Sequence, residues 1–178
     1  MSELHQTDDL INIFNSLFLK TLNTELVAGD HEPVYLPASA DYPHHRIVFA
    51  HGYFASALHE ISHWCVAGSE RRELEDFGYW YKPDGRTLNE QAEFERVEIK
   101  PQAYEWILSI SAGKRFHFSA DNLSSGLGAS PFFKSQVLSC IDDRLKTGMN
   151  SRLKALSDSL SACYQCPELS IEPFFLID

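Results

Sequence analysis

Residues His59-Glu60-Ile61-Ser62-His63 spell an H-E-x-x-H motif. The surrounding segment, from about residue 53 to residue 67, has the apolar spacing of a helix, and Gly68 is a natural stop. Side chains four residues apart lie on one face of a helix, so His59 and His63 can bind one metal ion. Glu60 then lies beside that ion as the candidate catalytic acid or base.

The motif helix is apolar on nearly every side, and such a helix is typically buried. One apolar stripe consists of Phe54, Leu58, Ile61 and Cys65. Histidine and glutamate side chains inside a core are costly unless they are paired or bind a metal. The sequence therefore predicts a buried metal-binding helix at the centre of the fold.

A metal held by two histidines usually takes a third protein ligand, which is often a carboxylate. Two downstream glutamates are the main candidates, Glu95 and Glu98. Glu98 stands between the apolar residues Val97 and Ile99, and we expect it to point inward. We predict Glu98 as the third ligand and keep Glu95 as the alternative.

Two classes of enzyme fit this ligand set. With zinc, the motif predicts a metallopeptidase in which Glu60 activates a water molecule. With iron(II), two histidines and one carboxylate leave positions open for dioxygen and substrate. The motif alone favours the peptidase, and a non-catalytic protein with a structural metal is a third hypothesis. Tyr79 and Tyr81 are candidate substrate-binding residues, because their aromatic stretch can wall a groove.

Length and charge narrow the class of protein. The chain has 178 residues, which suits a single domain over 1–178. Its 15 basic and 25 acidic residues give a net charge of −10, which disfavours nucleic acid or an anionic membrane as a partner and suits a cationic ligand.

We see no signal peptide, no membrane-spanning run and no glycine-rich nucleotide motif, and the four cysteines are dispersed. We therefore expect a cytoplasmic protein without a nucleotide cofactor.

The rest of the pattern predicts an α+β fold, helix-rich, with a small β-sheet. We expect a helix over residues 10–18, a helix from about Pro101 to Gly113, and helices over 131–147 and 151–163. The short apolar run at 47–50 is either a buried strand or the approach to the motif helix. By analogy, a buried H-E-x-x-H helix with a carboxylate further along the chain is zincin-like, meaning that it is similar to the zinc peptidases.

Longer strings around the motif resemble a known family. The run from residue 45 to 86, HRIVFAHGYFASALHEISHWCVAGSERRELEDFGYWYKPDGR, and the run from 94 to 103, FERVEIKPQA, closely resemble the bacterial elongation factor P hydroxylases. FNSLF at 14–18 and GDHEPVYLPA at 29–38 match the same family. These strings are far more specific than the five-residue motif.

The resemblance implies a metal-dependent protein-lysine hydroxylase, a monooxygenase that acts with dioxygen on a β-lysylated lysine of elongation factor P. It implies a non-haem metal, iron(II) as the expected ion with zinc as the alternative, held by His59, His63 and Glu98. Elongation factor P is then the protein partner. An acidic protein suits the cationic lysyl side chain of such a substrate.

Overall fold

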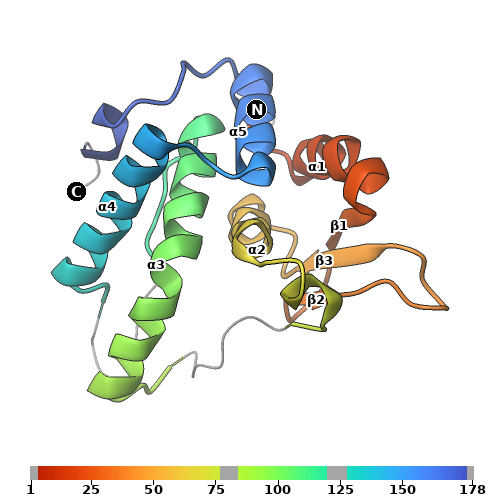
Figure 1. Ribbon diagram of the computed structural model, residues 1–178, viewed down its shortest axis with the longest axis horizontal. Helices are drawn as coiled ribbons and strands as arrows, with labels where there is room; N and C mark the ends of the chain where they lie inside the picture. Colours follow the sequence, from red (N-terminus) through yellow and green to blue (C-terminus); the bar gives the residue numbers. More distant parts are fainter. Residues whose placement is uncertain (1–3, 77–83, 120–127, 176–178) are drawn as a thin grey trace.

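The computed structural model describes residues 4–76, 84–119 and 128–175, which hold five α-helices and three short strands. Figure 1 shows a small sheet at one side of the molecule and helices making up the rest, so the prediction of a helix-rich α+β fold is confirmed. In chain order the elements are α1 (Thr7–Leu22), β1 (Thr24–Ala28), β2 (Val34–Leu36), β3 (His45–Phe49), α2 (Phe54–Val66), α3 (Leu88–Ser111), α4 (Pro131–Thr147) and α5 (Ser151–Tyr164). Two short 3-10 helices are η1 (Arg71–Glu73) and η3 (Glu172–Phe175).

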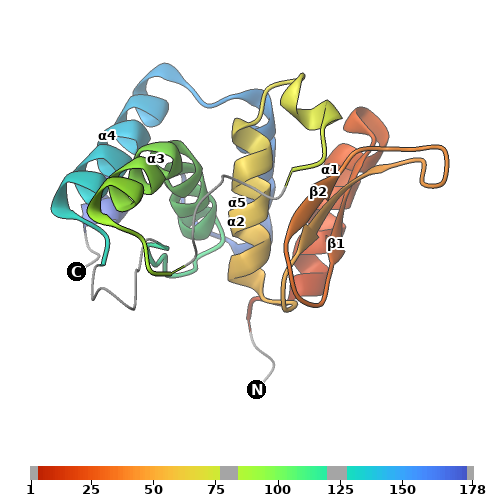
Figure 2. The ribbon, with the colours of Figure 1, turned by 90° about the horizontal axis from the view of Figure 1, so that it is seen from below.

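Helix α2, which carries the motif, stands in the middle of the molecule. In Figure 2 it lies between α3 and α4 on one side and the sheet with α1 on the other. It packs against α1, α3, α5 and β3, and Ala55 is its one exposed residue. The predicted bounds and burial of the motif helix are confirmed. A helix enclosed in this way holds its polar side chains in fixed positions.

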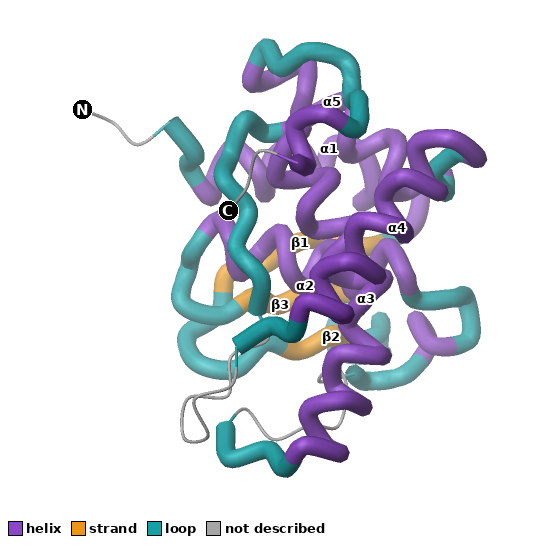
Figure 3. Tube along the Cα trace, turned by 90° about the vertical axis from the view of Figure 1, so that its left-hand side faces the viewer, coloured by secondary structure: helices purple, strands orange, loops and turns teal. Residues whose placement is uncertain are grey.

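The sheet has the strand order β1-β3-β2. Figure 3 shows β3 between its two neighbours; it runs parallel to β1 and antiparallel to β2. Ile47 and Phe49 of β3 are buried in the core, so the apolar run at 47–50 forms most of a strand, which is the first of its two alternatives. Asn23 adopts a left-handed conformation with φ of 50°, which ends α1 and lets the chain enter β1 directly.

Helix α3 differs from its prediction, because it begins at Leu88 and not near Pro101. Its start is set by a capping box: Glu90 N–H donates to Thr87 Oγ1, and Thr87 N–H donates to the Glu90 carboxylate. Pro101 lies inside the helix, where a proline removes one hydrogen bond at a cost of about 3 kcal/mol. Burial of the following turns, with Trp106 and Ile107 in the core, offsets that cost.

The remaining helices agree with their predictions. Leu10, Phe14 and Phe18 form the buried face of α1. Helices α4 and α5 span the predicted segments, and Phe174 of η3 packs edge-on against Trp106 with 5.5 Å between ring centroids. In the part of the chain that the structure describes, no helix is long and apolar enough to cross a membrane.

We predict that Thr87→Ala lowers the free energy of unfolding by about 1 kcal/mol, because it removes the side-chain cap of α3. Thr87→Ser keeps the hydroxyl and should restore most of the stability. The matched control is Thr21→Ala in α1, where the hydroxyl bonds to Leu17 O within the helix and caps no free N–H. Urea denaturation of the three variants measures the difference. Equal losses at positions 87 and 21 would contradict the capping role.

Candidate metal centre

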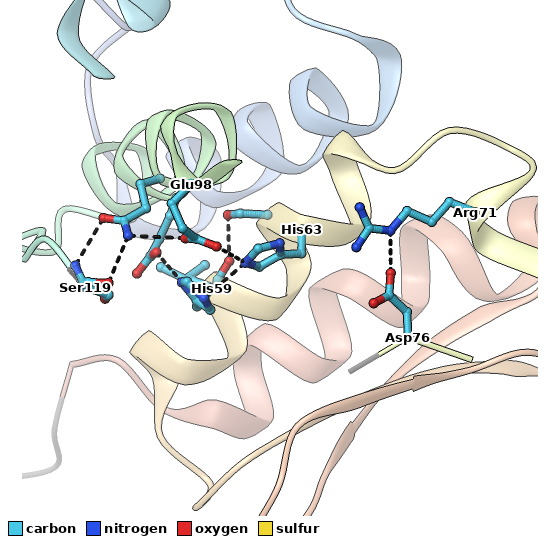
Figure 4. Close-up of polar contacts among 10 residues, drawn as sticks. His59, His63, Arg71, Asp76, Glu98 and Ser119 are labelled. Carbon is cyan, nitrogen blue, oxygen red and sulfur yellow. Dashed lines mark hydrogen bonds and ion pairs between the residues drawn. The ribbon is translucent and has the colours of Figure 1, made fainter. Parts of the chain in front are cut away.

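The two motif histidines point to a common spot beside α3. His59 Nε2 and His63 Nε2 are 3.2 Å apart, and His63 Nε2 lies 3.1 Å from Glu98 Oε1. Within the described residues, these three side chains form a group whose ligand atoms all lie within 4.8 Å of one another. Figure 4 shows His59 and His63 on α2 facing Glu98 on α3. Two helices distant in sequence thus bring two imidazoles and one carboxylate together.

The state of Glu98 fits a bound cation. Its side chain has 0% exposure, so its carboxylate has lost the water that would otherwise solvate it. Gln102 donates to Oε2, whereas the buried Oε1 accepts no well-directed hydrogen bond from the residues that the structure describes. This oxygen faces two imidazole nitrogens. A divalent metal is the kind of group that such a set of donors coordinates.

Glu95, the alternative third ligand, lies elsewhere on α3. Its carboxylate accepts from the backbone N–H of Ser130 at 3.0 Å and from the Ser130 hydroxyl at 2.5 Å. Ser130 is the N-cap of α4, so Glu95 fixes the start of that helix. The geometry therefore groups Glu98, and not Glu95, with the histidines.

A second carboxylate forms a hydrogen bond with His59 at Nδ1, the ring nitrogen other than Nε2. Glu105 Oε2 lies 2.8 Å from His59 Nδ1, and both side chains are largely buried. A hydrogen bond to Nδ1 fixes the proton on that nitrogen and leaves Nε2 as the metal-binding atom. Sequence reasoning missed Glu105 and also Gln102. The signal was their spacing: Glu98, Gln102 and Glu105 follow the 0, +4, +7 pattern of one helix face.

The electrostatics of the group favour positive charge at its centre. Burial alone would lower the pKa of His59, but Glu105, with Glu60 and Glu98, outweighs it and raises that pKa to about 10. Burial raises the pKa of the Glu60 carboxyl, and Glu98 and Glu105 add to this although both histidines oppose it. For Glu98, burial raises the pKa but the neighbouring His63 outweighs it, so the net pKa is lowered. Three carboxylates around two imidazoles thus attract a proton or a metal cation.

A cavity of about 350 Å³ adjoins the group, and His59, Glu60 and Glu105 line part of it. Another part of its wall is the segment 114–119, which contributes Lys114, Arg115, Phe116, His117 and Ser119. A smaller hollow of about 30 Å³ is lined by Glu60 and His63 together with Tyr35 and Trp64. Glu60 therefore borders both spaces next to the histidines, as a catalytic acid or base would. Tyr79 and Tyr81, predicted to bind substrate, lie outside the described residues.

Fold and site together define a helix-rich protein with an H-E-x-x-H candidate metal centre completed by a carboxylate from a second helix. The model of the family "Elongation factor P hydroxylase" matches residues 13–174. A curated relative, the elongation factor P lysine hydroxylase of Haemophilus influenzae, is 50% identical over 160 residues, which cover 90% of each chain. The chain belongs to the elongation factor P hydroxylase family.

The two glutamates of α3 can be told apart by a matched pair of variants. We predict that Glu98→Ala abolishes metal binding in calorimetric titration of the metal-free protein with iron(II) under argon. Glu95→Ala should bind the metal as the wild type does, but lose about 1–3 kcal/mol of stability because Ser130 loses a charged acceptor. Metal binding that survives Glu98→Ala and is lost in Glu95→Ala would reverse the assignment.

The role of Glu105 predicts a graded effect on metal affinity. Glu105→Ala should weaken the Kd for iron(II) by about 10–100-fold, because His59 loses the partner that orients it. Glu105→Gln should weaken it less, since an amide oxygen still accepts from Nδ1. Glu93→Ala is the control, because Glu93 is an exposed glutamate of the same helix that pairs with Arg96. A wild-type Kd in Glu105→Ala would refute the orienting role.

Proposed function

We propose that this protein hydroxylates a lysine of elongation factor P at a metal centre held by His59, His63 and Glu98. The observation that carries the proposal is family membership, supported by a relative of 50% identity that is itself named an elongation factor P lysine hydroxylase. Family membership selects the hydroxylase over the peptidase, the two classes of enzyme that the motif leaves open. The grouping of the three side chains supplies a site where the reaction can take place.

Iron(II) is the metal we propose, with zinc as the alternative ion. Two imidazoles and one carboxylate are the ligands of non-haem iron oxygenases, and a bound iron would supply the binding and activation of dioxygen. The described residues bring three ligands together, whereas a structural site closes its shell with four. Glu105 is engaged with His59 Nδ1 and so supports a ligand without adding to the shell. This argues against a merely structural metal.

The cavity beside His59 is the route we propose for the lysine side chain. Near the histidines its lining carries Glu60 and Glu105, whereas Lys114 and Arg115 lie on the wall segment 114–119. Ala55 and Phe116 offer apolar surface for an aliphatic chain. A protein of net charge −10 also attracts a cationic side chain. In this arrangement Glu60, whose pKa burial raises, takes up or releases a proton beside the reacting carbon. Tyr79 and Tyr81 are proposed to wall the entrance.

We also propose the domain organisation, the fold comparison and the cellular location of this protein. One continuous hydrophobic cluster that draws on all five α-helices and two strands supports a single hydroxylase domain over 1–178. The buried motif helix beside a carboxylate-bearing helix supports the zincin-like comparison. Because its substrate is a translation factor, we place the protein in the cytoplasm.

Elongation factor P from cells that lack this protein should be lighter by one oxygen atom at the modified lysine than the factor from normal cells. The wild-type gene should restore the oxygen, and His63→Ala should not, because it removes a ligand without touching the cavity wall of segment 114–119. Peptide mass spectrometry measures the difference.

Two outcomes would overturn the proposed function. One is an unchanged mass of elongation factor P in the absence of this protein. The other is a zinc-loaded protein that cleaves unstructured polypeptides, with the cleavage lost in Glu60→Gln, since that behaviour defines the peptidase alternative.

A further inference from the structure

Gln102 lies on the face of α3 that carries Glu98 and Glu105, and its side chain has 0% exposure. Its amide makes three hydrogen bonds. Nε2 donates to Glu98 Oε2 at 3.2 Å and to the backbone oxygen of Ser119 at 3.2 Å, and Oε1 accepts from the backbone N–H of Ser119 at 3.1 Å. Figure 4 shows these contacts running from the glutamate to Ser119.

The partners of Gln102 allow one orientation of its amide. Glu98 Oε2 and Ser119 O are acceptors, so they need the two hydrogens of the NH₂ group, and Ser119 N–H needs the carbonyl oxygen. A flipped amide would bring its oxygen against two acceptors and lose all three bonds. Both amide hydrogens and the amide oxygen are therefore committed, and the side chain has a single stable position.

The two ends of this contact belong to different parts of the site. On one side, the bond to Oε2 fixes the Glu98 carboxylate so that Oε1 faces His63. On the other side, Ser119 belongs to the segment 114–119 that walls the cavity. Within that segment Phe116 stacks on Trp106 of α3 at 4.9 Å between centroids, so the wall is fastened to the helix at two points.

We infer that Gln102 is a positioning residue that joins the metal ligand Glu98 to the wall of the substrate cavity. Because Gln102 holds Oε2, Oε1 is the oxygen that Glu98 would offer to a bound metal. Gln102 also holds Ser119, and with it the wall, against the same helix. Binding of a metal therefore orders the wall, and an ordered wall in turn favours metal binding. The inference rests on the proposed function for what the cavity receives, but not for the contacts themselves.

A simpler reading is that Gln102 only satisfies buried polar groups, as many core amides do. The chain offers a matched control for that reading. Gln91 is another buried glutamine of α3; it accepts from Arg86 Nε and donates to Glu95, away from the histidines. If both glutamines were merely structural, replacing either one would lower the stability of the fold and leave metal binding unchanged.

The test compares Gln102→Met with Gln91→Met, since methionine keeps the length and helix propensity of glutamine without its hydrogen bonds. One readout is the Kd for cobalt(II), measured on metal-free protein. The other is hydrogen exchange of the Ser119 amide by NMR, with and without zinc. We expect Gln102→Met to weaken cobalt binding by about 10–100-fold. Zinc should slow Ser119 exchange in the wild type and in Gln91→Met, but not in Gln102→Met.

Two results would overturn the inference: a wild-type cobalt Kd in Gln102→Met, or a wild-type Ser119 amide whose exchange does not respond to zinc. If Gln102→Met does not fold, Gln102→Asn replaces it, because its amide is one methylene too short to span Glu98 and Ser119 and should show the same losses. Neither readout involves elongation factor P. A failure of the inference is therefore distinguishable from a failure of the proposed hydroxylase activity.

Discussion

A carboxylate without exposed surface faces two imidazoles across the contact between α2 and α3, and the rest of the site depends on this arrangement. Burial removes the water that would solvate the Glu98 carboxylate, so hydrogen-bond donors or a cation must stabilise its negative charge. Gln102 donates a hydrogen bond to Glu98 Oε2, and Oε1 faces His63. The buried carboxylate and the two imidazoles together form the donor set of the proposed metal centre.

Helix α3 brings three side chains to one face: Glu98 as the proposed ligand, Gln102 as the proposed positioning residue, and Glu105, which hydrogen-bonds to His59. Helix α2 offers two imidazoles at the matching four-residue spacing. Because both helices are packed into one core, the distances between the ligand atoms are set by helix packing and not by loops. Such rigid support holds a reaction centre in a single geometry.

The motif helix was predictable because its signal is local: apolar residues all round, with polar side chains four apart. The start of α3 was not, because Pro101 looked like a first-turn residue while the capping box at Thr87 and Glu90 lies well before it. That error placed Glu98 ahead of the helix and so hid the face that it shares with Gln102 and Glu105. The reaction type could not come from the ligands, since zinc and iron accept the same set. The longer flanking strings carried that information.

The most direct test of this account is a crystal structure of protein purified under argon with iron(II), with anomalous diffraction recorded at the iron edge. We expect one anomalous peak about 2.0–2.2 Å from His59 Nε2, His63 Nε2 and Glu98 Oε1, with Glu105 on His59 Nδ1 and Gln102 on Oε2. A peak bound through Glu95, or a group of His59, His63 and Glu98 that stays without metal at saturating iron, would contradict it.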